Sequence, residues 1–348
     1  MTVIHLITGL GGGGAEHMVL ELSRMAKSES VNTLVISITD SNKIAEKFLD
    51  DEINHDFLSI NSLKEFRSGF KRLKSILGQK GHFVLHCHMF HAAMLGMIYK
   101  LFVKNVPIVF TMHTNTVKQL YRRFLLFFTK SFRNDIIFST NSKKWYLNNR
   151  IVIPNGVDLR KFNYDKIRTY NHSERFSFLF LGRLSKPKNP LFLINLIDRL
   201  TSAKIDNFVI DVVGDGPLKN ELTAMLDKSE TKQYINFHGF KNDVIPFLHK
   251  SNCLILPSLW EGLPVSIIEA AASKLPVIAT PVGSIPEFLN NNNAYLVDLD
   301  HFHEAMMNVL SKYDQAVLRA ESLYNDIIST FDIQSVFKSH LKLYHSVI

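Results

Sequence analysis

The sequence predicts an α/β protein made of two doubly wound parallel-sheet domains. Short apolar runs alternate with longer segments of helical period, and this rhythm occurs twice, once on each side of a polar stretch at residues 161–175. The length of 348 residues also exceeds one ordinary core, since a domain usually has about 100–200 residues. A hydrophobic content of 46% and a charged content of 21% are typical of a globular chain.

The apolar runs mark the expected buried strands. In the first series they are VIHLIT (3–8), NTLVISI (32–38) and PIVFTMH (107–113), and in the second FSFLFLG (176–182), FVIDVVG (208–214), NCLILP (252–257) and PVIAT (276–280). We therefore expect an N-terminal domain at 1–165, a C-terminal domain at 166–330, and a helix at 331–348 that packs back towards the first domain. Ligands of such sheets bind beyond the carboxyl ends of the strands.

Charge and cysteine content restrict the setting. Residues 1–165 hold 22 Lys/Arg and 13 Asp/Glu, a net +9, whereas residues 166–348 hold 18 and 19, a net −1. We expect the N-terminal half to meet an anionic partner. Two cysteines make no disulfide framework, which favours a cytoplasmic protein. We interpret the first residues as a buried strand rather than a signal peptide, and no apolar window is long enough to span a bilayer.

A glycine loop follows the first strand. The candidate ligand-facing residues are Gly11, Gly12, Gly13 and Gly14, because glycine lets backbone N–H groups approach a ligand closely. A helix starting near Ala15 would direct its N-terminus at a phosphate or substrate. The spacing also matches the dinucleotide-binding fingerprint, with Asp40 after the next strand, and a purely structural turn is the other alternative.

Two cations follow the strand at 176–182. Arg183 and Lys188 lie in a loop that Pro187 and Pro190 stiffen. Two positive charges at the carboxyl end of a strand suit a diphosphate. The alternative is a solvated basic turn, which is the reading we prefer for Lys186.

Two acids, Glu261 and Glu269, occur in EGLPVSIIEA. Glu261 is expected in a strand-to-helix loop and Glu269 in the second turn of a helix over 265–273, with Pro264 in its first turn. Carboxylates accept hydrogen bonds from vicinal hydroxyls, and amides at a helix start hold phosphate oxygens. The alternatives are a capping acid and a buried core acid. The candidate donor contacts here are Gly262, Leu263, Pro264, Val265, Ser266 and Glu269.

The order of these motifs resembles a known family. A glycine-rich loop, a strand ending T-x-H, IPNGVD, GRL-x-x-x-KN, GDGP, EG-x-P-x-x-x-x-EA and G-x-x-PE occur between residues 9 and 287. This resembles the retaining glycosyltransferases of family four, also called glycosyltransferase group 1, which have the GT-B fold of two Rossmann-like domains. The two acids follow the family's E-x7-E element without a gap.

The resemblance implies a nucleotide-diphosphate sugar as donor, with UDP as the expected nucleotide. It implies that Arg183 and Lys188 bind the diphosphate, Glu269 the ribose, and Glu261 the transferred hexosyl or N-acetylhexosaminyl group. His113 resembles the family histidine near the donor sugar, and its alternative is a core histidine. We thus predict Glu261, His113, Arg183 and Lys188 as catalytic residues.

The same resemblance implies transfer with retention at the anomeric carbon. The cations and the helix start would stabilise the leaving diphosphate without a metal ion or other cofactor. His86, Cys87, His88 and His91 crowd one segment, but we expect no metal site there because Cys87 points away from His86 and His88.

Two basic segments predict docking on an anionic membrane. The first combines Lys64, Arg67, Lys71, Arg72 and Lys74 with Phe66, Phe70, Leu73, Ile76 and Leu77, and the second contains Lys118, Tyr121, Arg122, Arg123, Phe124, Phe127, Phe128, Lys130, Phe132 and Arg133. Such amphipathic basic helices lie on membrane surfaces. We expect a glycan or polyprenyl-diphosphate-linked acceptor, peripheral association with the inner face of the cell membrane, and no nucleic acid. The alternative is a pair of solvated helix faces over the core.

The leading hypothesis is a transferase for surface polysaccharide or lipopolysaccharide synthesis. One alternative is an NAD(P)-dependent oxidoreductase that uses the glycine loop, and another is a catalytically silent nucleotide-sugar-binding subunit of a polysaccharide complex. The sequence leaves the sugar, the base, the acceptor and the linkage open.

Overall fold

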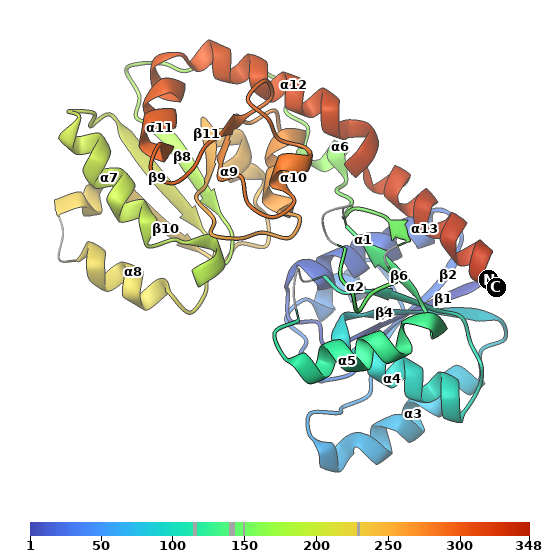
Figure 1. Ribbon diagram of the computed structural model, residues 1–348. Helices are drawn as coiled ribbons and strands as arrows, with labels where there is room; N and C mark the ends of the chain where they lie inside the picture. The colour runs from blue at the N-terminus through green and yellow to red at the C-terminus, as the bar shows by residue number, and fades with distance from the viewer. Residues whose placement is uncertain (114–116, 139–142, 149, 228–229) are drawn as a thin grey trace. The chain divides into compact units, whose positions relative to one another are not determined.

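The computed structural model describes residues 1–113, 117–138, 143–148, 150–227 and 230–348. These residues form two compact units (Figure 1). The N-terminal unit comprises Met1–Gly156 and Ile333–Ile348, and the C-terminal unit comprises Val157–Asp332. Each unit is an α/β domain with its own parallel sheet, as the sequence predicts.

The N-terminal unit has a seven-stranded sheet in the order β3-β2-β1-β4-β5-β6-β7. Its strands are β1 (Thr2–Ile7), β2 (Asn32–Ser37), β3 (His55–Phe57), β4 (Phe83–His88), β5 (Ile108–Thr111), β6 (Asn134–Ile137) and β7 (Ile151–Val152). The described pairings are all parallel. Because both faces of such a sheet are covered by helices, its strands are apolar almost throughout.

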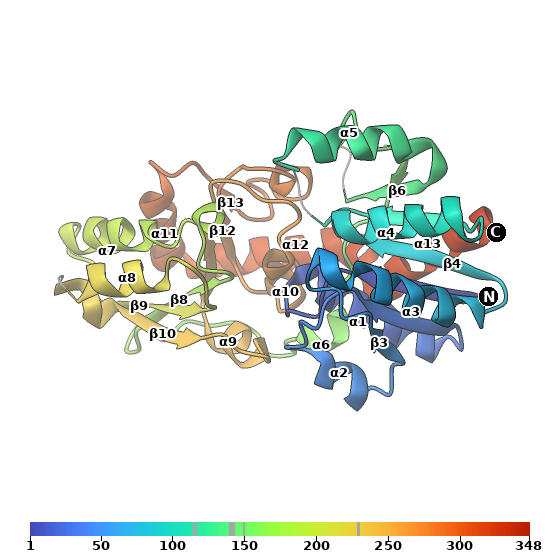
Figure 2. The ribbon, with the colours of Figure 1, turned by 90° about the horizontal axis from the view of Figure 1, so that it is seen from below.

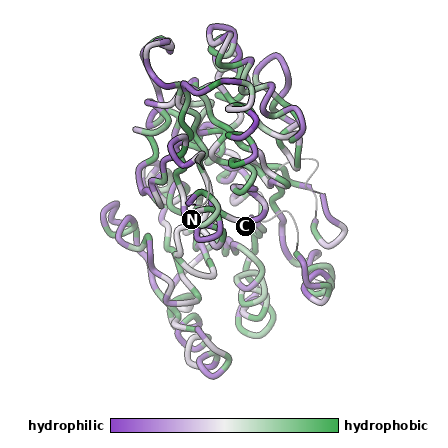
Figure 3. Tube along the Cα trace, turned by 90° about the vertical axis from the view of Figure 1, so that its left-hand side faces the viewer, coloured by the Kyte–Doolittle hydropathy of each residue, from purple (hydrophilic) through white to green (hydrophobic). Residues whose placement is uncertain are grey.

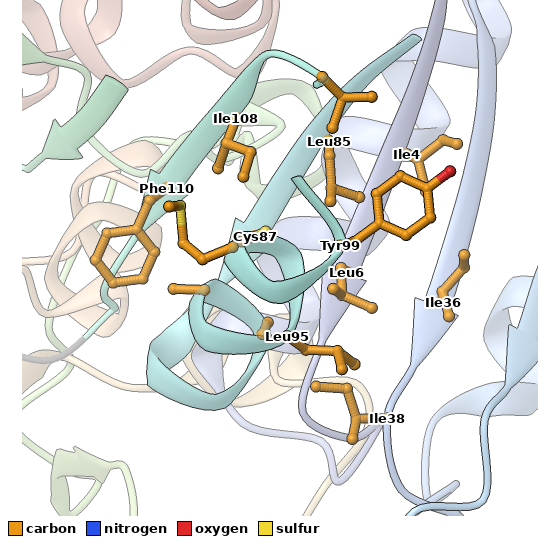
Figure 4. Close-up of a cluster of buried hydrophobic side chains, with 14 of the residues drawn as sticks. Ile4, Leu6, Ile36, Ile38, Leu85, Cys87, Leu95, Tyr99, Ile108 and Phe110 are labelled. Carbon is orange, nitrogen blue, oxygen red and sulfur yellow. The ribbon is translucent and has the colours of Figure 1, made fainter. Parts of the chain in front are cut away.

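Helices cover both faces of this sheet. They are α1 (Gly14–Ser28), α2 (Ala45–Asp50), α3 (Phe66–Gly78), α4 (Met89–Phe102), α5 (Leu120–Thr129) and α13 (Ile333–Val347). Figure 1 shows α3, α4 and α5 on one side and α1 and α13 on the other. Figure 4 shows the core on the first side, where Leu6 and Cys87 point from the strands towards Leu95 of α4.

The C-terminal unit has a six-stranded sheet in the order β10-β9-β8-β11-β12-β13. Its strands are β8 (Phe176–Leu181), β9 (Phe208–Val213), β10 (Ile235–Gly239), β11 (Cys253–Leu256), β12 (Val277–Ala279) and β13 (Tyr295–Leu296), and its helices are α6 (Leu159–Phe162), α7 (Phe192–Ser202), α8 (Lys219–Leu226), α9 (Ile245–Lys250), α10 (Val265–Ala272), α11 (Phe302–Ser311) and α12 (Tyr313–Phe331). Figure 2 shows β8, β9 and β10 side by side at one edge of this sheet.

The chain passes between the units twice, at neighbouring residues. On the C-terminal side, the backbone N–H of Val157 donates to the carbonyl oxygen of Phe331 over 2.8 Å. On the N-terminal side, Gly156 lies so close to Ile333 that an added Cβ would be 2.7 Å from Cδ1 of that residue. The expected domain boundaries at 165/166 and 330/331 therefore lie slightly inside the C-terminal unit, and the last helix is part of the N-terminal unit.

The stretch at 161–175 is more than the linker that its polarity suggests. Arg168 is buried, and its guanidinium donates to the carbonyl oxygens of Ser273, Ser251 and Leu248 over 2.8–3.1 Å. These carbonyls lie at the ends of α9 and α10, where helices leave acceptors without an intrahelical partner. This arginine therefore anchors the stretch to the C-terminal unit.

The hydropathy of the chain follows the layers. Figure 3 shows hydrophobic and hydrophilic stretches alternating along the helices, as expected where one face of each helix is buried. Among the described residues, no helix combines the length and apolar character that crossing a bilayer requires.

Replacing Arg168 by Met should destabilise the C-terminal unit. The change leaves the three buried carbonyl groups without donors, and each unsatisfied group costs about 1–3 kcal/mol. We expect a loss of at least ~3 kcal/mol in the free energy of unfolding, measured by urea denaturation. The control is Arg175→Met, because exposed Arg175 donates to one carbonyl, that of Gln233. Equal losses in the two variants would contradict the anchoring role.

Candidate functional site

Three loops lie side by side at the carboxyl end of the C-terminal sheet. They follow β8, β9 and β11. The N–H of Leu184 donates to the carbonyl of Asp215 over 3.0 Å, and the N–H of Leu259 donates to the carbonyl of Pro187 over 2.8 Å. The strand order explains this contact, because β8 lies between β9 and β11.

The contact between the first two loops requires glycine at position 214. Gly214 has φ of +148°, and a Cβ there would lie 1.9 Å from the carbonyl oxygen of Gly182. No side chain fits in that space. The GDGP motif is thus explained by the close approach of the loop that carries Arg183.

An ion pair joins the loops after β8 and β11. Nζ of Lys188 lies 2.7 Å from Oε1 of Glu261, and the hydroxyl of Ser258 donates to the same oxygen over 2.6 Å. Glu261 is only 7% exposed, so its charge needs this partner. The predicted cation and the predicted acid therefore meet directly.

Glu269 lies in α10, near Lys188. Burial raises the pKa of its carboxyl group to about 7, and the positive charge of Lys188 opposes that rise. Among the described residues, its carboxylate forms no hydrogen bond or ion pair. A buried acid whose pKa is raised by desolvation, beside a specific charged neighbour, is a candidate for a functional-site residue.

Arg183 follows β8 and its side chain is exposed. Within the described part of the chain, its guanidinium has no acidic partner, so it remains available for a ligand. Lys186 is also exposed. The Lys188 side chain passes close to Gly182, since a Cβ added at Gly182 would lie 3.4 Å from Cε of Lys188.

The start of α10 differs in one detail from the expectation. Pro264 is the N-cap rather than a residue of the first turn, and α10 runs from Val265 to Ala272. The hydroxyl of Ser266 in the first turn is buried, and among the described residues it has no hydrogen-bond partner. Gly262 accepts from the hydroxyl of Ser284, while Leu263 packs against the core of the unit.

The glycine loop lies in the N-terminal unit. Gly12 has φ of +85°, Gly13 is the N-cap, and α1 begins at Gly14, one residue before the expected start. Asp40 accepts hydrogen bonds from the Ser59 hydroxyl and the Asn61 amide over 2.7 and 2.6 Å. The carboxylate that would complete the dinucleotide-binding fingerprint is therefore hydrogen-bonded to neighbouring side chains.

His113 follows β5 and is half-buried. Its φ is +56°, an uncommon conformation for a residue with a side chain. Burial lowers the pKa of its imidazole to about 3. A small cavity beside it is lined by Met18, Leu22, His86, His88, Thr111, His113, Phe138, Pro154, Asn155 and His340.

The structure brings a third histidine to His86 and His88. His5 of β1 lies opposite His86 of β4, and the ligand atoms of these three residues all lie within 4.8 Å of one another. Of the described residues, these three histidines form the group whose ligand atoms lie close enough together to hold a metal ion. However, both ring nitrogens of His86 and of His88 take part in hydrogen bonds, and an ion would have to displace these bonds.

Sequence reasoning missed two of these residues. Ser258 precedes Glu261 by three positions, so its place in the same loop was a usable signal. His5 interrupts an otherwise apolar strand, and a polar residue there was also a signal. Neither signal shows which residue the side chain contacts. Ser258 bonds to Glu261 across the loop, and His5 bonds to His88 on another strand.

Comparisons with known proteins agree with this architecture. The family Glycosyltransferase Family 4 matches residues 12–161, and the family Glycosyl transferases group 1 matches residues 175–312. Among solved structures, HepE of Anabaena in complex with UDP and glucose has a TM-score of 0.85 at 16% identity, covering 99% of this chain and 100% of that one. At that identity the likeness shows the fold alone.

Two proteins of similar sequence are named as glycosyltransferases. The chain is 27% identical to the Escherichia coli UDP-Gal:alpha-D-GlcNAc-diphosphoundecaprenol alpha-1,3-galactosyltransferase over 322 residues, 82% of each protein. It is 26% identical to the Staphylococcus aureus capsular polysaccharide biosynthesis glycosyltransferase CapH, over 80% of this chain and 81% of the relative.

The two parallel-sheet units have the GT-B fold, and the two family matches identify a glycosyltransferase. The two family matches together span most of the chain, which belongs to the family 4, or group 1, glycosyltransferases. The family assignment leaves no ground for the oxidoreductase alternative.

Replacing Glu269 by Gln should remove a pH-dependent part of the stability. The folded pKa of about 7 lies above the ordinary value of 4.5, so the folded state holds this proton more tightly than the unfolded state. That stabilisation is complete below pH ~4.5 and is lost as the pH rises through 7, an effect of about 3 kcal/mol. Relative to the wild type, the Gln variant should therefore gain stability between pH 5 and pH 8.

Urea unfolding followed by Trp260 fluorescence measures this effect. The protein has two tryptophans, so a Trp145→Phe background leaves a single reporter in the C-terminal unit. Glu287→Gln, at an exposed position, is the control. A difference between Glu269→Gln and the wild type that stays constant from pH 5 to pH 8 would contradict the buried-acid interpretation.

Proposed function

We propose that this protein is a retaining glycosyltransferase that moves a sugar from a UDP-sugar to a hydroxyl group of a glycan or lipid-linked acceptor. The acceptor would belong to a surface polysaccharide or lipopolysaccharide. The observation that carries the proposal is the contact of Lys188 with Glu261 over 2.7 Å, beside Glu269 and the start of α10. The names of the relatives support the choice of donor and acceptor class.

The donor diphosphate would be bound by cations and by the start of α10. Arg183 is exposed and unpaired among the described residues, and a guanidinium suits a diphosphate because its donors form a fixed fork. The buried hydroxyl of Ser266 lacks a partner among those residues, which a phosphate oxygen would supply. We assign the neighbouring backbone of Gly262, Leu263, Pro264 and Val265 to the same region.

The two acids would bind hydroxyl groups of the donor. Glu261, held by Lys188 and Ser258, is fixed in orientation, as a residue that positions the transferred sugar must be. Glu269 would bind the ribose. Its pKa of about 7 lets the carboxyl group accept or donate, since both protonation states are populated at neutral pH.

The reaction would proceed without a metal ion. Arg183 and Lys188 would offset the charge that develops on the leaving diphosphate. The attacking hydroxyl would approach the face from which the diphosphate departs, and a phosphate oxygen would take its proton. His113, held neutral by burial, would hydrogen-bond the transferred sugar without adding a positive charge near the anomeric carbon. The loop of Gly11, Gly12, Gly13 and Gly14 is assigned to donor binding.

Arg183→Met should weaken donor binding by about 10–100-fold, because hydrogen bonds to charged groups contribute about 1.5–3 kcal/mol. Lys186→Met is the matched control, since it removes an exposed cation from the same loop. Binding is measured by thermal shift and calorimetry with a panel of UDP-sugars. A loss in Lys186→Met as large as in Arg183→Met would contradict the assignment of Arg183.

Slow hydrolysis of the donor by the wild type separates an enzyme from a catalytically silent binding subunit.

We also propose that the protein associates peripherally with the cytoplasmic face of an anionic membrane through α5. This helix and its surroundings expose an aromatic surface formed by Tyr121, Phe124, Phe127, Phe128, Phe132 and Trp145, each between 37% and 69% exposed. An apolar patch of this kind usually marks an interaction site. Lys130 lies 4.2 Å from the ring centroid of Phe127, so the surface carries positive charge as well.

Two parts of the expected basic membrane-binding surface, α3 and Arg133, differ in the structure from the prediction. The apolar side chains of α3, among them Phe70 and Leu73, pack into the core, and Arg72 pairs with Asp56 over 2.5 Å, so α3 has a solvated basic face. Arg133 is buried in an ion pair with Asp135 and adds nothing to the surface of α5. The α5 surface is therefore the better candidate for membrane contact.

Replacing Phe124 and Phe128 by Ser should weaken binding to phosphatidylglycerol vesicles at least tenfold. Each buried aromatic side chain contributes about 1.5–3 kcal/mol, and both lie on the exposed side of α5. The double variant Leu318→Ser, Ile328→Ser removes two exposed apolar side chains from α12 and is the control. Vesicle sedimentation at low and high salt measures the binding. Unchanged sedimentation of the Phe variant would contradict docking through α5.

A further inference from the structure

Five histidines gather in the N-terminal unit, from β1, β4, the end of β5 and α13. They are His5, His86, His88, His113 and His340. His5, His86 and His88 are at most 1% exposed. They lie on the sheet face that α1 and α13 cover, the same face as the Val3 and Val84 side chains. Polar rings at such depth are stable only when they are hydrogen-bonded.

Three of these rings form a hydrogen-bonded chain. Nδ1 of His5 lies 3.0 Å from Nε2 of His88, and Nδ1 of His88 lies 2.8 Å from Nε2 of His113. His86 is bonded elsewhere, to the hydroxyls of Tyr344 and Thr111 over 2.7 and 2.9 Å. The chain therefore runs from the centre of the sheet to His113 at its carboxyl edge.

The neutral state of the rings fixes the direction of the chain. Burial lowers the pKa of His5 and His113 to about 3, and that of His88 well below the ordinary value. A neutral imidazole has one N–H and one acceptor nitrogen. His88 must therefore donate to one neighbour and accept from the other, so both hydrogen bonds run the same way along the chain.

The far end of the chain selects one of the two directions. Among the residues that the structure describes, the side-chain hydrogen bond of His5 is formed through Nδ1 and not Nε2, and His5 is 1% exposed whereas His113 is half-buried. A chain that runs towards His5 would place an N–H at Nε2 of His5, and buried N–H groups without an acceptor are rare. The other direction places the last N–H on Nδ1 of His113.

We propose that His88, supported by His5, is a positioning residue that fixes the ring orientation of His113 and holds its proton on Nδ1. This inference rests on the proposed function, in which His113 contacts the transferred sugar. Nδ1 of His113 forms no hydrogen bond within the described part of the chain, so its N–H would be free to donate to a substrate oxygen. The φ of +56° at His113 indicates a backbone that its surroundings hold in place.

Two substitutions at His88 separate positioning from stability. The amide of Asn reaches the place of the imidazole Nδ1 and keeps the bond to His113, whereas the longer Gln reaches the place of Nε2 and keeps the bond to His5. Both replace a fully buried ring by an amide, so they should lower the melting temperature by similar amounts. A purely structural role would affect them equally.

The kinetic test compares hydrolysis of a UDP-sugar by the two variants. We expect kcat of His88→Gln to be at least ~10-fold below that of His88→Asn, the effect of one lost positioning hydrogen bond, with the donor KM little changed. Equal kcat values, or a loss confined to KM, would overturn the proposal. If the wild type hydrolyses no UDP-sugar, the proposed function fails. A spectroscopic measurement then tests the hydrogen-bonded chain of histidines independently of activity.

That measurement is ¹⁵N NMR of the histidine rings in the wild-type protein, without donor. His113→Asn identifies the His113 signals among those of the 15 histidines. We expect the Nδ1–H tautomer of His113 in the wild type and in His88→Asn, and a mixture of tautomers in His88→Gln. An Nε2–H tautomer in the wild type, or the same tautomer in all three proteins, would overturn the proposal.

Discussion

The ion pair between Lys188 and Glu261 is the contact on which the C-terminal site depends. It exists because β11 lies next to β8 in the sheet, so that two loops far apart in sequence meet at one edge. Glu261 on its own would be a buried charge without compensation, which costs several kcal/mol. The same cation lowers the cost of ionising Glu269. Lys188 thus fixes the orientation of Glu261 and opposes the rise in the pKa of Glu269.

The buried histidines of the N-terminal unit and the buried charges of the C-terminal unit are stabilised in opposite ways, although the N-terminal unit also contains the buried ion pair of Arg133 with Asp135. The C-terminal unit keeps its charges and compensates them, by Lys188 at Glu261 and by carbonyl groups at Arg168. In the N-terminal unit, burial removes the charge of the histidines, and neutral rings bond to one another. Fixed charges suit an anionic diphosphate, whereas neutral donors suit a region where positive charge develops. This division fits the roles proposed for the two sets of residues.

The sequence predicts features that follow from local pattern. Continuous apolar runs identified the buried strands, and because parallel strands end at a common edge, Lys188 and Glu261 could be expected near each other. The sequence alone could not show which polar residues are buried. Arg168 looks like part of a linker until the helix ends that it contacts are known. Likewise α3 and α5 have similar amphipathic patterns, and only the packing shows that α3 buries its apolar face.

The position of α13 has a consequence for the order of folding. The C-terminal unit is inserted between two segments of the N-terminal unit, so the ribosome completes the inserted unit before it makes the last helix of the other. Until α13 emerges, the part of the sheet face that it covers is open to water, and His86 lacks its hydrogen-bond partner Tyr344. During synthesis the second half of the chain can therefore reach its native state first, although domains generally fold from the N-terminus onward.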